Sequence, residues 1–258
     1  RWGVLPIAPE GVPSLLSMAE VVAVGMMLPN ELIWIMDKMG LEWPDIDEDE
    51  VHKAADLVRG YRDDMESIIQ AVDSRVNGDL ATALQGNAGT AQVEGWNRNR
   101  SDNMQKLLDV LGPAATGIDI AGGIVLAMKI KVIAEVTLTL MQLVPLLAAG
   151  PLGAGGAALL LLARKKLLSM AMEATIEQVI NEVLPLAVEP LAEQVPVIVM
   201  ALMDAPVVEG AIGDVDEFEA DLEALEAAAD EMDAQAVDIE DRTDRLLADL
   251  ANLQISGD

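Results

Sequence analysis

The sequence contains no cysteine, one histidine, one tyrosine and one phenylalanine among its 258 residues. The absence of cysteine excludes a disulfide framework, a thiolate metal site and a cysteine nucleophile. A single histidine excludes the usual histidine-rich zinc and iron sites. Aromatic residues make up only 2% of the chain, so few large side chains are left to pack a β-sheet.

Basic residues are also scarce, with 16 Lys and Arg against 44 Asp and Glu and a net charge of −28. Such a surface repels phosphate backbones, so we expect no nucleic-acid binding. Apolar residues make up 52% of the chain, which excludes a fully disordered protein. The abundance of Ala, Leu, Met and Glu favours helices, so we expect an all-α, non-enzymatic protein.

Helical periodicity predicts a long antiparallel hairpin over residues 48–84 and 90–148. The turn between its arms is predicted at Gly86–Gly89, and Gly112-Pro113 is expected to kink the second arm. A glycine turn then leads to a returning helix over 157–184. The fold class is therefore all-α, with a helical hairpin at its centre.

The stretch 136–163 contains no charged residue over 28 positions, longer than a transmembrane helix needs. Proline and a glycine-rich run interrupt it, so we interpret it as a buried hairpin or one covered by a partner. Lysines cluster at its open end, which leaves membrane insertion of this hairpin as the alternative function. The side chains that would enter the membrane are Leu146, Leu147, Leu159, Leu160, Leu161 and Leu162.

Residues 215–253 follow a heptad pattern typical of a long helix with a coiled-coil seam. Its a positions are Val215, Leu222, Ala229, Ala236, Thr243 and Leu250, and its d positions are Phe218, Leu225, Met232, Ile239, Leu246 and Leu253. Residues 214–258 carry 16 acids and two bases. Like charges would oppose a parallel homodimer, so we expect this helix to fold back on the chain's own hairpin or to bind a less acidic helix.

The expected organisation has four parts. They are a poorly ordered leader or mis-called start (1–26), a helical domain (27–205), a linker (206–213) and an acidic heptad helix (214–258). The glycines and proline at the boundaries and the change in charge pattern indicate this division.

Two clusters near residue 50 contain residue types that catalytic and metal sites use. His52 has Asp49 and Asp56 at helical spacing, but we interpret it as an exposed histidine on an acidic helix face and not as a catalytic group. Asp45, Asp47 and Asp49 alternate like the start of a calcium loop, but the glycine and glutamate that such a loop needs later are missing. We therefore expect no catalytic residue and no metal site.

Residues 153–158 match the dinucleotide fingerprint G-x-G-x-x-A, and Glu173 lies at the spacing of its acidic residue. That fingerprint works only after a strand in a βαβ unit, and no strand is expected here. We interpret the run as a hairpin turn and expect no cofactor.

The string MLPNELIWIMDKMGLEWPDIDEDEV, residues 27–51, is the most specific part of the sequence. It resembles the opening of the actinobacterial WXG-like N-terminal domains on type VII (ESX) secretion substrates and polymorphic toxins. A mycobacterial outer membrane channel protein with a C-terminal necrotizing toxin belongs to that group. The matching residues are Leu28, Pro29, Glu31, Leu32, Trp34, Gly40, Trp43, Pro44, Asp47, Glu48 and Asp49. Trp96 lies just beyond the turn, where the family's hairpin carries its tryptophan, and the likeness extends over about residues 27–205.

The resemblance implies a non-catalytic targeting or partner-binding domain of a type VII secretion substrate. It implies small WXG-type helical proteins and the secretion machinery as partners, and a chain that is cytoplasmic before export and then secreted or at the cell surface. The partner-binding residues it implies are Leu32, Trp34, Trp43, Pro44 and Trp96. The family's export signature is a tyrosine followed four residues later by an acid. It is not met here, because the residue four positions after Tyr61 is Met65. A partner would then supply the signal.

Overall fold

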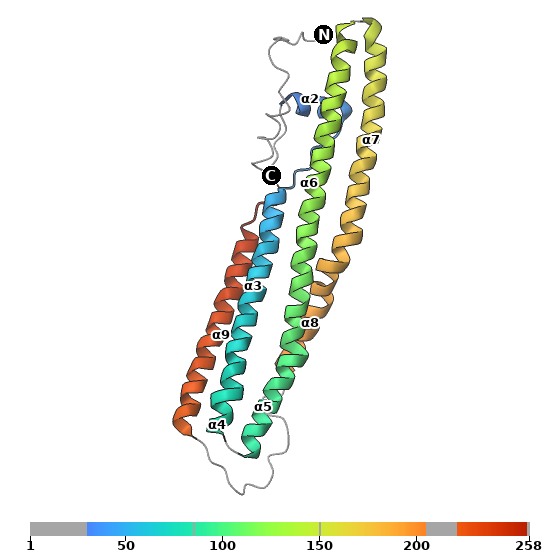
Figure 1. Ribbon diagram of the computed structural model, residues 1–258. Helices are drawn as coiled ribbons and strands as arrows, with labels where there is room; N and C mark the ends of the chain where they lie inside the picture. The colour runs from blue at the N-terminus through green and yellow to red at the C-terminus, as the bar shows by residue number, and fades with distance from the viewer. Residues whose placement is uncertain (1–29, 85, 150, 205–220, 257–258) are drawn as a thin grey trace. The chain divides into compact units, whose positions relative to one another are not determined.

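The structure is a computed structural model that describes residues 30–84, 86–149, 151–204 and 221–256 (Figure 1). Within these ranges the chain is mostly helical and forms no strand, and an isolated β-bridge pairs Ile46 with Ser256. The all-α prediction is confirmed. The expected leader (1–26) and linker (206–213), with Val215 and Phe218 of the heptad pattern, lie outside the described residues.

The described residues form two compact units, which we treat separately. The first contains residues 30–49, 125–149, 151–173 and Ser256, and the second contains most of the remainder, from residue 50 to 124 and from 174 to 255. Each unit is built from segments that are far apart in the sequence, so its core depends on long-range packing.

In the first unit, α2 (Asn30–Met39) packs against the end of α6 (Gln105–Ala148) and the start of α7 (Pro151–Val183). Gly40 ends α2 with a φ of +61°, a left-handed conformation that glycine adopts without strain. The core of this unit consists of Leu32, Ile35, Met36, Met39, Met128, Val132, Val136, Leu143, Ala157 and Leu168.

The hairpin between α6 and α7 turns earlier than the sequence suggested. The run Gly153–Gly156, expected to form the turn, lies inside α7, which already begins at Pro151. Pro151 explains the difference, because proline suits the first position of a helix, where its missing N–H is not needed. A Cβ on Gly156 would lie 3.4 Å from Leu146 Cδ2 on the other arm, an ordinary van der Waals contact, so the packing of the two arms does not require a glycine there.

The second unit contains the predicted hairpin. Its first arm is α3 (Glu48–Arg75), a π-helical turn η2 (Val76–Leu80) and α4 (Ala81–Ala83). Its second arm is α5 (Asn87–Asn99), a π-helical turn η3 (Arg100–Met104) and the first part of α6. The predicted arms, 48–84 and 90–148, agree closely with these bounds, and the buried residues between them are Val58, Met65, Ile68, Leu108, Leu111 and Ala115.

Several prolines lie inside continuous helical stretches. α6 runs without interruption through Pro113, and α7 continues through a π-helical turn η4 (Leu184–Val188) into α8 (Glu189–Asp204), which contains Pro196. A π-helical turn accommodates Pro185 because its wider backbone relieves the clash with the preceding turn. Small residues meet at this point, where a Cβ on Gly117 would lie 2.9 Å from Ala187 Cβ.

The acidic helix α9 (Leu222–Ala251) lies along α3 (Figure 1), the first of the two arrangements that the sequence left open. Its N-cap, Asp221, accepts a hydrogen bond from the Ala224 N–H at 3.1 Å. Tyr61 of α3 and Thr243 of α9 share a hydrogen bond of 3.0 Å between their hydroxyls. Arg242 binds Asp64 at 2.6 Å and Arg75 binds Glu231, so arginines of both helices join them across the pair.

The packed face of α9 is rotated from the predicted seam. Of the d positions, Leu225, Met232, Leu246 and Leu253 are half-buried as expected, whereas Ile239 is exposed. Of the a positions, Leu222, Ala229 and Ala236 are exposed, whereas Thr243 and Leu250 are half-buried. The partly covered positions beside the d residues are Ala228, Gln235 and Arg242. Alanine offers little area to bury, so Ala229 and Ala236 do little to hold α9 against α3, whereas the a position Thr243 binds Tyr61 of α3.

Candidate interaction surface

The segment after α2 is fixed to α6 by a buried lysine. Lys129 and Glu48 are only 3% and 4% exposed, and the Lys129 Nζ lies 2.5 Å from Glu48 Oε2. The same ammonium donates to the Ile46 carbonyl at 2.5 Å and lies 5.7 Å from the centre of the Trp43 ring. Burial of a charge is tolerable only with such partners. We call this group the Lys129 clamp; it holds the Trp43-Pro44 turn against the first unit's core.

The motif residues of α2 have different environments. Leu32 is 5% exposed and belongs to the core, whereas Trp34 is 37% exposed and its neighbour Ile33 is 49% exposed. The Lys38 ammonium lies 5.9 Å from the centre of the Trp34 ring. Trp34 and Ile33 are therefore the apolar residues accessible to a partner among the α2 side chains that the structure describes.

Trp96 belongs to the second unit, so the structure does not group it with Trp34 and Trp43. It is half-buried, and its indole Nε1 donates to Asp73 Oδ1 at 3.1 Å. Asp73 also binds Arg100 at 3.0 Å, and Asn77 and Asn97 exchange side-chain hydrogen bonds across the hairpin. This polar network near the turn went unnoticed in the sequence; only the tryptophan beyond a glycine turn indicated its place.

His52 binds a partner that the sequence did not suggest. Its Nδ1 shares a hydrogen bond with Asp119 of α6, and not with Asp49 or Asp56 on its own helix. The other oxygen of Asp119 accepts from Arg59 at 2.7 Å. Hydrogen bonds from His52 and then Arg59 lower the pKa of Asp119, and the bond with Asp119 raises the pKa of Arg59.

Gly122 leaves room for this pairing, because a Cβ there would lie 3.0 Å from the His52 ring. The cluster of His52, Arg59 and Asp119 therefore joins α3 to α6 as a polar crosslink on the hairpin. All three groups are taken up in contacts with one another.

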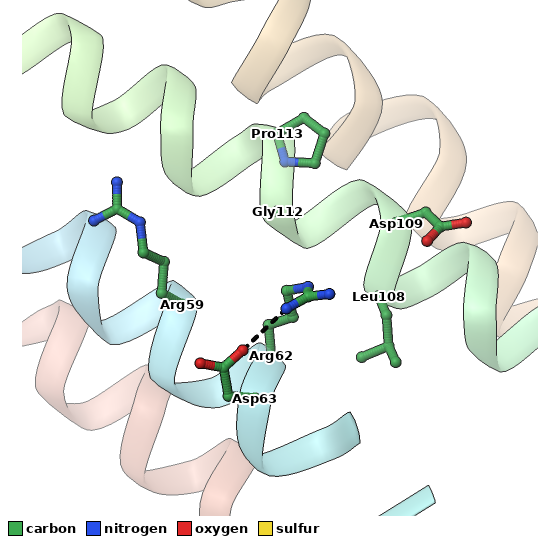
Figure 2. A pocket seen from close by; sticks show the side chains of 7 residues that line it. All are labelled: Arg59, Arg62, Asp63, Leu108, Asp109, Gly112 and Pro113. Atoms are coloured by element: carbon green, nitrogen blue, oxygen red, sulfur yellow. Dashed lines mark hydrogen bonds and ion pairs between the residues drawn. The ribbon is translucent and has the colours of Figure 1, made fainter. Parts of the chain in front are cut away.

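An open groove of about 510 Å³ lies between α3 and α6 in the second unit (Figure 2). It is lined by Arg59, Arg62, Asp63, Leu108, Asp109, Gly112 and Pro113. Arg62 binds Asp63 at 3.0 Å, so the charges on this wall largely neutralise each other. The lining offers no nucleophile paired with a base, and the described residues contain no cluster of His, Asp or Glu able to hold a metal ion.

Exposed apolar side chains on the helices are a more prominent feature than this groove. Within the described residues, one helical stretch, Gly155–Ala201, is long and apolar enough to cross a membrane, and only 17% of its most apolar window is buried. Leu159 and Leu162 are 71% and 65% exposed. Of the other leucines proposed for the membrane hairpin, Leu146, Leu160 and Leu161 are half-buried against the core, and the side chain of Leu147 lies outside the described residues.

These features define a class: an all-helical module with a long antiparallel hairpin, a tryptophan just beyond its turn and apolar faces open to contact. The WXG100-like domain family matches residues 25–169, more than half of the chain, and the chain belongs to this family. Membership relates the protein to type VII secretion, and the resemblance read from residues 27–51 is confirmed at the level of the domain. Neither a curated protein nor a solved structure matches the chain.

Proposed function

We propose that the chain is a non-catalytic targeting and partner-binding domain of a type VII secretion substrate. The observation that carries this proposal is the match of the WXG100-like family to residues 25–169, which include both arms of the hairpin. Its partners would be small WXG-type helical proteins and the secretion machinery. It would be cytoplasmic before export and then secreted or held at the cell surface, and in a polymorphic toxin such a domain would precede the effector.

The environment of Tyr61 supports export together with a partner. Its hydroxyl binds Thr243 of α9, and Met65 stands where the export signature needs an acid. The side chain is therefore engaged within the chain. A partner that carries a complete signature would supply the address for both proteins.

Trp34 and Ile33 are the contact residues we propose for that partner. They are adjacent, apolar and accessible on α2, and aromatic residues of this kind often dominate the energy of an interface. Trp43, Pro44 and Trp96 remain proposed partner-binding residues, although Trp43 and Trp96 already make internal contacts.

The test is affinity capture of the tagged full chain from its native host, with the medium assayed for secreted protein. We expect a small helical WXG-type protein to be captured, and its recovery to fall on Trp34→Asp. The matched control is Val237→Asp on α9, which is 65% exposed and should leave capture unchanged. Recovery of no such partner, together with no secretion, would refute the proposal.

A further inference from the structure

The end of the α6–α7 hairpin carries no charge. Its two arms, residues 136–148 and 151–163, have 13 residues each and reach about 20 Å from their base. Glu135 and Arg164 face each other across that base, 2.5 Å apart. This ion pair places the last charge of one arm level with the first charge of the other. We call the region beyond it the hairpin tip.

Large apolar side chains are exposed on both arms of the tip. They are Leu138, Met141, Val144, Leu159 and Leu162, each between 43% and 71% exposed. Of the tip side chains that the structure describes, only Val136, Thr139, Leu143 and Ala157 are buried. Exposed apolar groups of this density on one element mark a contact surface.

Behind the tip, the two helices of the hairpin themselves carry more bases than acids, whereas the segment 30–49 that packs on them carries seven acids and one base. Residues 125–172 contain five Lys and Arg and one acid, Glu135, in a protein of net charge −28. Three of these bases, Lys131, Lys165 and Lys166, are exposed just behind the base of the tip. Apolar side chains therefore precede cations along the hairpin axis.

This order fits a boundary between hydrocarbon and anionic headgroups better than it fits a partner helix. A helix that bound along the hairpin would need apolar and cationic contacts side by side over its length. A bilayer needs them in sequence by depth, with the lysines at the headgroups and the apolar end below them.

We propose that the hairpin tip docks into one leaflet of an anionic phospholipid bilayer. The hydrocarbon core of a bilayer is about 30 Å thick, so the tip, which reaches about 20 Å, is longer than one leaflet but too short to cross both. The hairpin would therefore enter from one side, tilted so that its tip stays within that leaflet. On either side of residue 150, two backbone positions need no hydrogen bond from the lipid, since the Ala149 N–H binds the Pro145 carbonyl at 3.2 Å and Pro151 has no N–H. This inference does not rest on the secretion role, because it uses only the exposure and charge of the hairpin.

Flotation of the full chain with lipid vesicles tests the proposal. We expect binding to phosphatidylcholine vesicles that contain about 30% phosphatidylglycerol, and little binding to phosphatidylcholine alone. The double variant Leu159→Asp/Leu162→Asp should stop flotation, and Lys165→Gln/Lys166→Gln should weaken it about fivefold for each lysine removed. Leu247→Asp, 60% exposed on α9, is the matched control.

Circular dichroism of each variant checks that the helices are intact. Absence of flotation, or flotation unchanged by Leu159→Asp/Leu162→Asp, would overturn the proposal. Two further measurements test other occupants of the tip: sedimentation without vesicles detects a second copy of the chain, and affinity capture detects a WXG-type partner. If the same double variant abolishes self-association or partner capture while the native chain does not float, the tip is a protein interface and the membrane proposal is wrong.

Discussion

Replacement of Lys129 by methionine should destabilise the protein far more than a surface substitution. Methionine has a similar length and fits an apolar site, so the change removes charge and leaves the volume nearly intact. Glu48 would then keep a carboxylate that is 4% exposed without its cation. Removal of one partner from such a buried pair costs about 3–5 kcal/mol, a large part of a typical total of about 5–15 kcal/mol.

A double-mutant cycle isolates the pair. Glu48→Gln should lower the free energy of unfolding less than Lys129→Met does. The Lys129 ammonium would keep its hydrogen bond to the Ile46 carbonyl, 2.5 Å away, and its cation–π contact with the Trp43 ring. Glu48→Gln/Lys129→Met leaves no buried charge in the clamp. Its cost should therefore fall short of the sum of the two single costs by at least about 1 kcal/mol.

Urea unfolding at neutral pH, followed by tryptophan fluorescence, measures these free energies, and Trp43 reports directly on the clamp. Lys131→Met, two positions further along the same helix and exposed, is the control and should change stability by no more than about 0.5 kcal/mol. A loss below about 1 kcal/mol for Lys129→Met, or costs that simply add in the double variant, would refute the reasoning.

Three further outcomes are expected. Asp119→Asn should lower the free energy of unfolding at pH 6 by about 1 kcal/mol or less, since the carboxylate is partly exposed. Because its neighbours lower the pKa of Asp119, this contribution to stability is present above the ordinary aspartate pKa and is lost as the pH falls through the lowered value. The free energies of unfolding of the native chain and the variant, measured by urea titration, should therefore converge in acid. Gly117→Ala should lower the melting temperature, because the added Cβ would lie 2.9 Å from Ala187 Cβ. Gly123→Ala has open space around it and should raise the free energy of unfolding by about 0.5–1 kcal/mol. The opposite ranking of the two variants would contradict the packing argument. A peptide of residues 214–258, with net charge −14, should stay monomeric in dilute buffer at neutral pH and associate near pH 4, which sedimentation would show; a stable dimer at pH 7 would contradict it.

Helix positions were readable from the sequence because local periodicity determines them. The arms over 48–84 and 90–148, and the tryptophan beyond their turn, follow from apolar spacing and turn glycines. The returning helix was also predicted, but its start was misjudged because four glycine and alanine residues suggested a turn more strongly than Pro151 suggested a helix start.

Side-chain partners could not be read in the same way. The partner of His52 is Asp119, 67 positions away, and their meeting depends on the register of two helices that no local pattern reports. The Lys129 clamp likewise joins positions 81 apart in the sequence. The heptad pattern predicted the helix and part of the face that meets α3, but not the contacts of Arg242 with Asp64 and of Thr243 with Tyr61 that join the two helices.

The pairing of α9 with α3 also has a consequence for folding during synthesis on the ribosome. Tyr61 and Thr243, which share a hydrogen bond, are 182 positions apart in the chain. At about 5–20 residues per second, a ribosome needs roughly 10–40 s to reach the second after the first. Throughout that interval the face of α3 around Tyr61 has no α9 to cover it. Any helix that competes for this face therefore has its best opportunity during synthesis, before the chain's own acidic helix emerges.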